Sequence, residues 1–208
     1  MRRLLRWYAR HHRTLPWRQT KDPYRILVSE VMLQQTQVSR VIPKYREFIR
    51  AYPSLDALAR ASTRAVRELW YPLGYNIRPR RLRDIARSAV HRFGGRLPST
   101  REELLSLKGI GPYTVGAMLT FAFGKPAPIV DTNVRRVLRR VFFGGKPVPE
   151  AVLWQLSGAL LPASDGYDFN QAIMELGATV CRARTPACAT CPMRPLCLAA
   201  PLLEGRQR

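Results

Sequence analysis

Residues Leu107 to Ala117 read LKGIGPYTVGA and place three glycines, one proline and one tyrosine between two apolar runs. Two interpretations fit this stretch. A plain corner between two helices uses glycine for its turn. A phosphate-binding turn uses the backbone N–H groups that precede a helix, because these groups and the positive end of the helix dipole attract an anion. The sequence on either side helps to choose between them.

The residues that flank this hinge favour two helices. Ser99 and Thr100 followed by Glu102 and Glu103 are typical of a capped helix start. The run TVGAMLTFAF after the hinge continues as a second helix. A helix, a glycine hairpin and a helix form an element that binds DNA backbones without reading bases. The residues expected to contact the DNA backbone are Lys108, Gly109, Ile110 and Gly111.

The rest of the chain predicts an all-α fold. Apolar residues recur at helical spacing between two breaks rich in Gly and Pro, residues 70–80 and 123–131. Ser54 and Ser62 stand where helix N-caps are expected. Alternating runs of β-branched residues, which would indicate strands, do not occur. We find no internal repeat and no low-complexity tract.

The charge of the chain points to a polyanionic partner. Lys and Arg number 35 against 14 for Asp and Glu, which gives a formal net charge of +21. A field of this sign gathers nucleic acid. The alternative is an arginine-rich proteome that places Arg on every solvated face. No apolar run is long enough for a membrane span, and the basic start lacks the features of a signal peptide. We therefore expect a cytosolic, reducing environment.

Four cysteines lie close together near the end of the chain. They follow the pattern C-x6-C-x2-C-x5-C and comprise Cys181, Cys188, Cys191 and Cys197. In a reducing environment they are expected to be thiolate ligands rather than disulfides. Both zinc and an iron–sulfur cube accept four cysteines. We favour a [4Fe–4S] cluster over zinc, because structural zinc sites more often use two CxxC pairs with a long spacer. The loop also carries arginines that could face phosphates.

An aspartate opens the basic segment that follows the second break. Asp131 stands in PAPIVDTNVRRVLRR, after an apolar run and before a basic helix. One interpretation is an ordinary N-cap, a position that Asp favours. The other is a functional carboxylate aimed at a cleft between two lobes. Taken alone, the cap is the better-supported interpretation.

The ordered set of LKGIGPYTVGA, IVDTNVRRVL and the cysteine pattern resembles the helix-hairpin-helix (HhH-GPD) DNA glycosylase superfamily. LPWRQTKDPYRILVSEVMLQQTQV and FNQAIMELGATVC are most similar to its MutY-like adenine glycosylase family. The resemblance spans roughly residues 14 to 200. It implies a six-helix lobe, 18–127, and a second lobe made of 1–17 and 128–208 with the cluster loop 181–197. DNA would lie bent across the cleft with one nucleotide flipped out.

The resemblance also implies catalytic roles. Glu30 matches the acid that protonates the purine ring, and Asp131 matches the carboxylate that stabilises or attacks the oxocarbenium-like sugar. One carboxyl must be protonated while the other is ionised, so the two pKa values should be pushed apart. Tyr113 stands where bifunctional lyases carry a lysine, and tyrosine cannot form a Schiff base. Asn133 and Arg18 match positions that orient the acid and the base.

Further matches lie in two segments that the family uses to enter the duplex and to contact the base opposite the target. Hydrogen bonding to base edges and stacking between base steps are the expected contacts. The residues are Gln34, Gln35, Thr36, Leu73 and Tyr75. Tyr113 is expected to face DNA as well.

The sequence departs from the MutY pattern at two places. MutY proteins carry a further C-terminal domain that recognises 8-oxoguanine, whereas this chain ends at Arg208, either by truncation or by nature. Asn76 stands where MutY has a second tyrosine. Three activities therefore stay open, namely adenine removal opposite 8-oxoguanine or guanine, thymine or uracil removal from mismatches with guanine, and DNA binding without catalysis. The expected partner is double-stranded DNA with a mismatch or an oxidised base. We expect a cytoplasmic, nucleoid-associated monomer.

Overall fold

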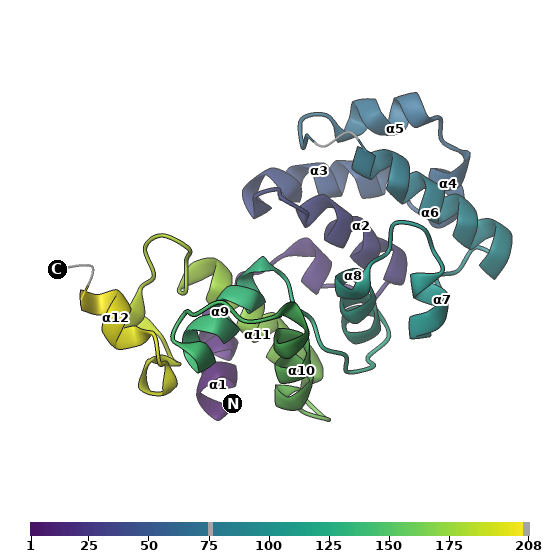
Figure 1. The fold of residues 1–208 in the computed structure, drawn as a ribbon. Coiled ribbons are helices and arrows are strands. Elements are labelled where there is room, and N and C mark those ends of the chain that lie inside the picture. Colours follow the sequence, from purple (N-terminus) through teal and green to yellow (C-terminus); the bar gives the residue numbers. More distant parts are fainter. Residues whose placement is uncertain (75–76, 206–208) are drawn as a thin grey trace. The chain divides into compact units, whose positions relative to one another are not determined.

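A computed structural model describes residues 1–74 and 77–205 of the chain (Figure 1). Every regular element in these two ranges is helical, which confirms the all-α prediction. The chain divides into two compact units. Residues 14–124 form the middle unit, and residues 1–13 together with 125–208 form the terminal unit. That the two units act as lobes on DNA stays a prediction. No helix in the described ranges is long and apolar enough to cross a membrane.

The middle unit is a set of packed helices. Helix α6 packs against α4 and α5, and α2 packs against α3, α6 and the π-helical turn η2. Large side chains from these helices fill the core, among them Phe48, Trp70 and Leu82. The elements are η1 (Pro16–Arg18), α2 (Pro23–Leu33), α3 (Val38–Ala51), α4 (Leu55–Arg60), α5 (Thr63–Trp70), α6 (Ile77–Phe93), α7 (Arg101–Leu105), α8 (Pro112–Ala117) and η2 (Met118–Ala122).

Local capping explains where several of these helices begin. The hydroxyl of Ser54 accepts the amide of Ala57, and the hydroxyl of Ser62 accepts the amide of Ala65, which confirms both predicted N-caps. The carboxylate of Asp22 caps α2 in the same way. The break expected over residues 70–80 is shorter than the sequence suggested, because α6 already begins at Ile77 and accommodates a proline in its first turn.

The glycine hairpin forms as predicted between α7 and α8. Gly109 has a φ of +106°, a conformation that side chains with a Cβ rarely adopt, so glycine is required there. Gly111 is the N-cap residue of α8, and Pro112 stands at its first position. The amide of Ile110 donates to the carbonyl of Leu107 at 3.0 Å. The phosphate-binding prediction therefore rests on the amides of Gly109 and Gly111.

The terminal unit packs four helices around one apolar core. Helix α11 lies against both α1 and α9, and α10 lies against α9. Val134, Leu138 and Leu176 are among the buried residues of that core. Arg13, just beyond α1, donates two side-chain hydrogen bonds to the buried carboxylate of Glu175 and so fastens the N-terminal segment to α11. The elements are α1 (Arg2–His11), α9 (Thr132–Phe143), α10 (Glu150–Leu160), α11 (Gly166–Thr179), η3 (Cys188–Thr190), η4 (Arg194–Leu196) and α12 (Ala200–Gly205).

Candidate active site and cysteine pocket

Glu30 and Tyr113 form a hydrogen-bonded pair inside the middle unit. Glu30 lies in α2, between Ser29 and Val31, and only 4% of its surface is exposed. The hydroxyl of Tyr113 donates to Oε2 of Glu30 at 2.6 Å. The sequence alone allowed Glu30 to be a solvated helix charge. The structure excludes that interpretation, because a solvated charge would not be buried among apolar residues and held by a phenol.

The hairpin decides where the Tyr113 hydroxyl lies. Tyr113 is the second residue of α8, directly after Gly111 and Pro112, so the turn at Gly109 fixes the direction in which the ring enters the unit. Its partner Glu30 is 83 positions earlier in the chain. A short O–H···O contact to a carboxyl group is among the stronger hydrogen bonds in proteins. The pair therefore gives a fixed acid and a fixed phenol on two different helices.

Asp131 is the N-cap of α9 in the terminal unit. Its Oδ1 accepts the amide of Val134 at 2.6 Å, and its Oδ2 accepts the side-chain amide of Asn133 at 3.1 Å. The capping interpretation from sequence is thus confirmed, and it does not conflict with a chemical role. Burial raises the pKa of Asp131, although these two hydrogen bonds and the charge of Arg136 lower it in part. This increase of the Asp131 pKa is the reverse of the decrease expected for a carboxylate kept ionised by its surroundings.

Asn133 is held from two sides by residues that sequence reasoning missed. Nη2 of Arg136 donates to Oδ1 of Asn133 at 2.8 Å and to the carbonyl of Gly177 at 2.7 Å. A Cβ at Gly177 would lie 2.6 Å from the Cβ of Asn133, so α9 and α11 approach closely only because residue 177 is glycine. The signal was present, since an isolated glycine inside a helical pattern often has a packing reason.

The five residues expected at the catalytic centre fall into both compact units. Arg18, Glu30 and Tyr113 belong to the middle unit, whereas Asp131 and Asn133 belong to the terminal unit. Arg18 ends the short helix η1, which packs against α2. Within each unit the structure brings the expected partners together in two pairs, Glu30 with Tyr113 and Asp131 with Asn133. A shared pocket for all five stays a prediction.

The residues expected to enter the duplex differ in their exposure. Gln35 is exposed and has a φ of +54°, the only positive φ of a non-glycine residue in the described ranges. Gln34 and Thr36 are half-buried beside it. Leu73 is only 3% exposed, so it could insert between bases only if its loop moved. The residues Tyr75 and Asn76 lie outside the described ranges.

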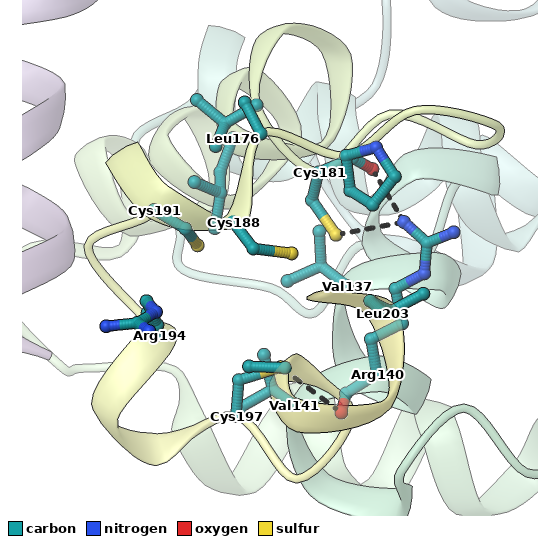
Figure 2. A pocket seen from close by; sticks show the side chains of 14 residues that line it. Val137, Arg140, Val141, Leu176, Cys181, Cys188, Cys191, Arg194, Cys197 and Leu203 are labelled. Carbon is teal, nitrogen blue, oxygen red and sulfur yellow. Dashed lines mark hydrogen bonds between the residues drawn. The ribbon is translucent and has the colours of Figure 1, made fainter. Parts of the chain in front are cut away.

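The four cysteines line one pocket of the terminal unit (Figure 2). The pocket spans about 370 Å³ when the space open to solvent is counted, and its wall is completed by apolar side chains from α9 and α11. None of the four forms a disulfide. Arg140 is also at the pocket, and its Nη1 lies 3.4 Å from the sulfur of Cys181.

The chemistry of this pocket fits a metal–sulfur group. Burial, and to a smaller extent the nearby Cys181, Cys197 and Cys188, raise the pKa of the Cys191 thiol to about 11, although a backbone hydrogen bond from Met193 lowers it in part. Four thiolates would therefore be costly here without a cation. The described residues contain no set of three or more His, Cys, Asp or Glu side chains already arranged to hold a metal ion. The cysteines are thus gathered at one pocket, while the arrangement of ligands around a metal stays a prediction.

Comparison with known proteins relates these features to one family. The chain is 45% identical over 217 residues to the human adenine DNA glycosylase, covering 98% of this chain and 40% of that protein. It is 36% identical over 205 residues to the thymine-DNA glycosylase of Aeropyrum pernix, covering 95% of this chain and 92% of that protein. The solved structure of a thermostable thymine-DNA glycosylase superposes with a TM-score of 0.91 at 33% identity, covering 97% of this chain and 94% of that one.

A family match covers both candidate carboxyl groups. Residues 28–159 match the family described as the HhH-GPD superfamily of base excision DNA repair proteins, a segment that includes Glu30, the hairpin and Asp131. The match and the two relatives confirm the resemblance expected from the sequence. The chain belongs to the HhH-GPD superfamily of base excision DNA repair proteins.

Proposed function

We propose that this protein is a DNA glycosylase that removes adenine mispaired with 8-oxoguanine or guanine by hydrolysing the N-glycosidic bond. The observation that carries the proposal is the buried pair of Glu30 and Tyr113, because a glycosylase for adenine needs a positioned acid. The high identity to an adenine DNA glycosylase over almost the whole chain supports the choice of adenine. The chain spans less than half of that relative, so the activity of the whole relative is carried over here as part of the proposal.

The proposed chemistry divides the work between two carboxyl groups. Adenine is a poor leaving group as an anion, so Glu30 donates a proton to a ring nitrogen as the bond to the sugar breaks. Burial makes a charged carboxylate costly at Glu30, which suits a group that must carry a proton. Asp131, as its carboxylate, stabilises the positive charge that develops on the sugar. Asn133 orients Asp131 through its amide, and Arg18 is the remaining polar group proposed near the acid.

We propose that the protein leaves an abasic site and does not cut the strand. A lyase of this family forms a Schiff base with a lysine, and Tyr113 stands at that position. Tyr113 is instead engaged with Glu30. A glycosylase reaction followed by alkali should cleave a labelled strand, whereas the same reaction without alkali should leave it intact.

We propose that the cysteine pocket holds a [4Fe–4S] cluster. Cys181, Cys188, Cys191 and Cys197 would be its ligands, and the apolar wall from α9 and α11 would exclude water. When bound, such a group supplies four metal–thiolate bonds that tie the C-terminal loop to the unit. A brown colour with broad visible absorbance, and equal amounts of iron and acid-labile sulfide, would distinguish it from zinc.

Double-stranded DNA is the proposed partner, bound by a monomer at the nucleoid. The net charge of +21 supports a polyanion, and the exposed Lys108 and Gly109 at the hairpin are proposed to contact a phosphate together with Gly111. Gln34, Gln35, Thr36 and Leu73 are proposed to face the base opposite the extruded nucleotide. The affinity should fall steeply with salt, because phosphate contacts release counterions.

A second candidate is removal of thymine or uracil opposite guanine. It is favoured by the thymine-DNA glycosylases, which match this chain over almost their whole length and share its fold closely. Both candidates use the same acid and the same aspartate. The two candidates differ in which base the enzyme accepts. The Glu30–Tyr113 pair and the Asp131–Asn133 pair do not decide this.

One experiment separates these functions. The purified protein is incubated with four duplexes that contain A opposite 8-oxoguanine, A opposite G, T opposite G, or U opposite G, and base release is followed by alkaline cleavage. The proposal expects release from the two adenine duplexes only. Release from T and U alone would select the second candidate. Salt-dependent binding without release of any base would leave a DNA-binding protein and refute both.

A further inference from the structure

Arg78 is a buried arginine that joins three segments of the middle unit. It lies in the first turn of α6 and is only 4% exposed. Its Nη1 donates to the carbonyls of Val31 and Met32 at 3.1 and 3.0 Å, and so satisfies carbonyls at the end of α2. Nη1 also reaches the carbonyl of Gln34.

The second nitrogen of the same guanidinium reaches the other two segments. The two N–H groups of Nη2 are shared among three acceptors, Oγ1 of Thr36 at 3.0 Å, the carbonyl of Leu73 at 3.1 Å and the carbonyl of Gly74 at 3.2 Å. The planar group also lies over the ring of Trp70, with its carbon 5.5 Å from the ring centroid. One side chain therefore holds residues 34–36 and residues 73–74 in a single arrangement.

Gln35 shows why such a clamp is needed. It is exposed, and its φ of +54° lies in the left-handed region, where a Cβ meets steric crowding from the backbone. Backbone strain of this kind persists only where the surroundings enforce it. Arg78 bonds the residue before Gln35 and the residue after it, so the guanidinium fixes both ends of the strained position.

We propose that Arg78 is a positioning residue for recognition of the mispair. It makes residues 34–36 and 73–74 one preorganised surface that probes the duplex, and thereby sets the discrimination between mispaired and fully paired DNA. The inference rests on the proposed function only in assigning these two segments to the DNA. Arg78 itself is buried and touches no phosphate in this role.

Lysine cannot replace this arginine. The guanidinium presents donors on two nitrogens in a fixed plane, whereas an ammonium is a single point with three donors. Arg78→Lys therefore keeps the charge but loses the link between the two segments. The matched control is Arg87→Lys, an exposed arginine further along the same helix α6.

The test measures DNA binding in an Asp131→Asn background, in which catalysis is removed. Its result therefore does not depend on which base the protein releases. Dissociation constants are measured for an A:8-oxoguanine duplex and for the matched duplex, per active molecule and at several salt concentrations. 2-Aminopurine next to the mispair reports unstacking of the duplex. We expect Arg78→Lys to lower the ratio of the two affinities by about tenfold or more, a change of 1.4 kcal/mol or more. The salt dependence of matched-duplex binding should stay unchanged, and the 2-aminopurine signal should fall.

A merely structural role would lower the active fraction or the Tm and leave the affinity ratio and the 2-aminopurine signal unchanged, and that result overturns the proposal. If Arg78→Lys does not fold, Thr36→Val removes one acceptor of the Arg78 side chain and should lower the same ratio of affinities. An unchanged ratio in Thr36→Val would also overturn the proposal. Gln35→Gly relieves the strain, so the loss of Tm caused by Arg78→Lys should be smaller in that background. If the unmodified protein released no base, the proposed function would be refuted. The effect of Arg78→Lys on the ratio of affinities would still test the role of Arg78.

Discussion

The two carboxyl groups proposed for the chemistry are held in opposite ways. Glu30 stands in the middle of a helix, is buried, and accepts a hydrogen bond from a phenol 83 positions away in the chain. Asp131 is the N-cap of a helix and accepts a backbone amide three residues on. The position of Glu30 therefore depends on the packing of distant segments, whereas that of Asp131 depends on the local geometry of the helix start.

The difference teaches how one reaction can use two carboxyl groups in different states. A carboxyl group buried in the interior, as Glu30 is, suits a proton carrier, because burial disfavours its charged form. A carboxylate at a helix N-terminus meets backbone amides and the positive end of the helix dipole, which favour its charged form, although at Asp131 burial outweighs them and raises the pKa. The predictions below test this division of roles.

The largest expected effect is that of Asp131→Asn. Asparagine is as good an N-cap as aspartate, so α9 should keep its start while the negative charge is lost. Base release should fall by about 10³-fold, the size found when one electrostatic stabiliser is removed, while DNA affinity is kept. Single-turnover rates and binding isotherms measure the two quantities. Asp22→Asn, an exposed N-cap of the same kind, is the control. Unchanged turnover in Asp131→Asn would contradict the assigned role.

Glu30→Gln should have the next largest effect. The amide keeps the size of the side chain and can accept from Tyr113, but it cannot donate a proton as an acid. The rate of base release should fall by about 10²-fold. Because the general acid is lost, the decline of the rate on the alkaline side should also disappear from the pH profile. Glu68→Gln, exposed on α5, is the control. A pH profile that keeps its shape would argue against Glu30 as the proton donor.

Tyr113→Phe tests the anchor of Glu30 rather than the acid itself. It removes the 2.6 Å hydrogen bond and leaves the ring. A hydrogen bond between neutral groups contributes about 0.5–1.5 kcal/mol, so we expect base release to fall by no more than about tenfold. Tyr71→Phe, whose side chain is 74% exposed, should change nothing. A rate equal to that of the unmodified protein would show that the Tyr113 hydroxyl is not needed to hold the carboxyl group.

The smallest expected effect is a dependence of stability on pH at Asp131. Burial raises the pKa of this group in the folded protein above its ordinary value of 3.8, so the folded state binds the proton more tightly than the unfolded state. The charged form therefore destabilises the fold once the pH rises through the folded pKa. Asp131→Asn should raise the Tm by no more than about 2 °C near neutral pH, since 1 kcal/mol shifts the Tm of a chain of this size by about 2–4 °C. The gap should close below pH 3.8. If the difference in Tm between Asp131→Asn and the unmodified protein increased on acidification, the pKa of Asp131 would not be raised in the folded state and this account would be refuted.

Local chemistry explains what sequence analysis predicted correctly. The N-caps Ser54 and Ser62 and the turn at Gly109 depend on neighbours a few residues away. The all-α fold follows from apolar spacing in the same way. The membership of the superfamily also follows from ordered motifs, because several of them occur in one sequence.

The partners of long polar side chains could not be predicted in this way. Arg78 is one of 35 basic residues, and no pattern in RPRR distinguishes it from the exposed arginines around it. Its burial depends on where α2, the 34–36 turn and the 73–74 turn meet. The contact between Gly177 and Asn133 likewise depends on the packing of α9 against α11, which the sequence pattern did not predict.

The sequence by itself determined the helical class, the glycine turn, the cysteine spacing and the two carboxyl groups, because each depends on residue type and short-range spacing. Only the tertiary structure decided that Glu30 is buried against Tyr113, that the cysteines share one pocket and that Arg78 clamps a strained turn. The physical reason is that burial and hydrogen bonding between distant residues depend on the packing of helices, which single-residue preferences do not specify.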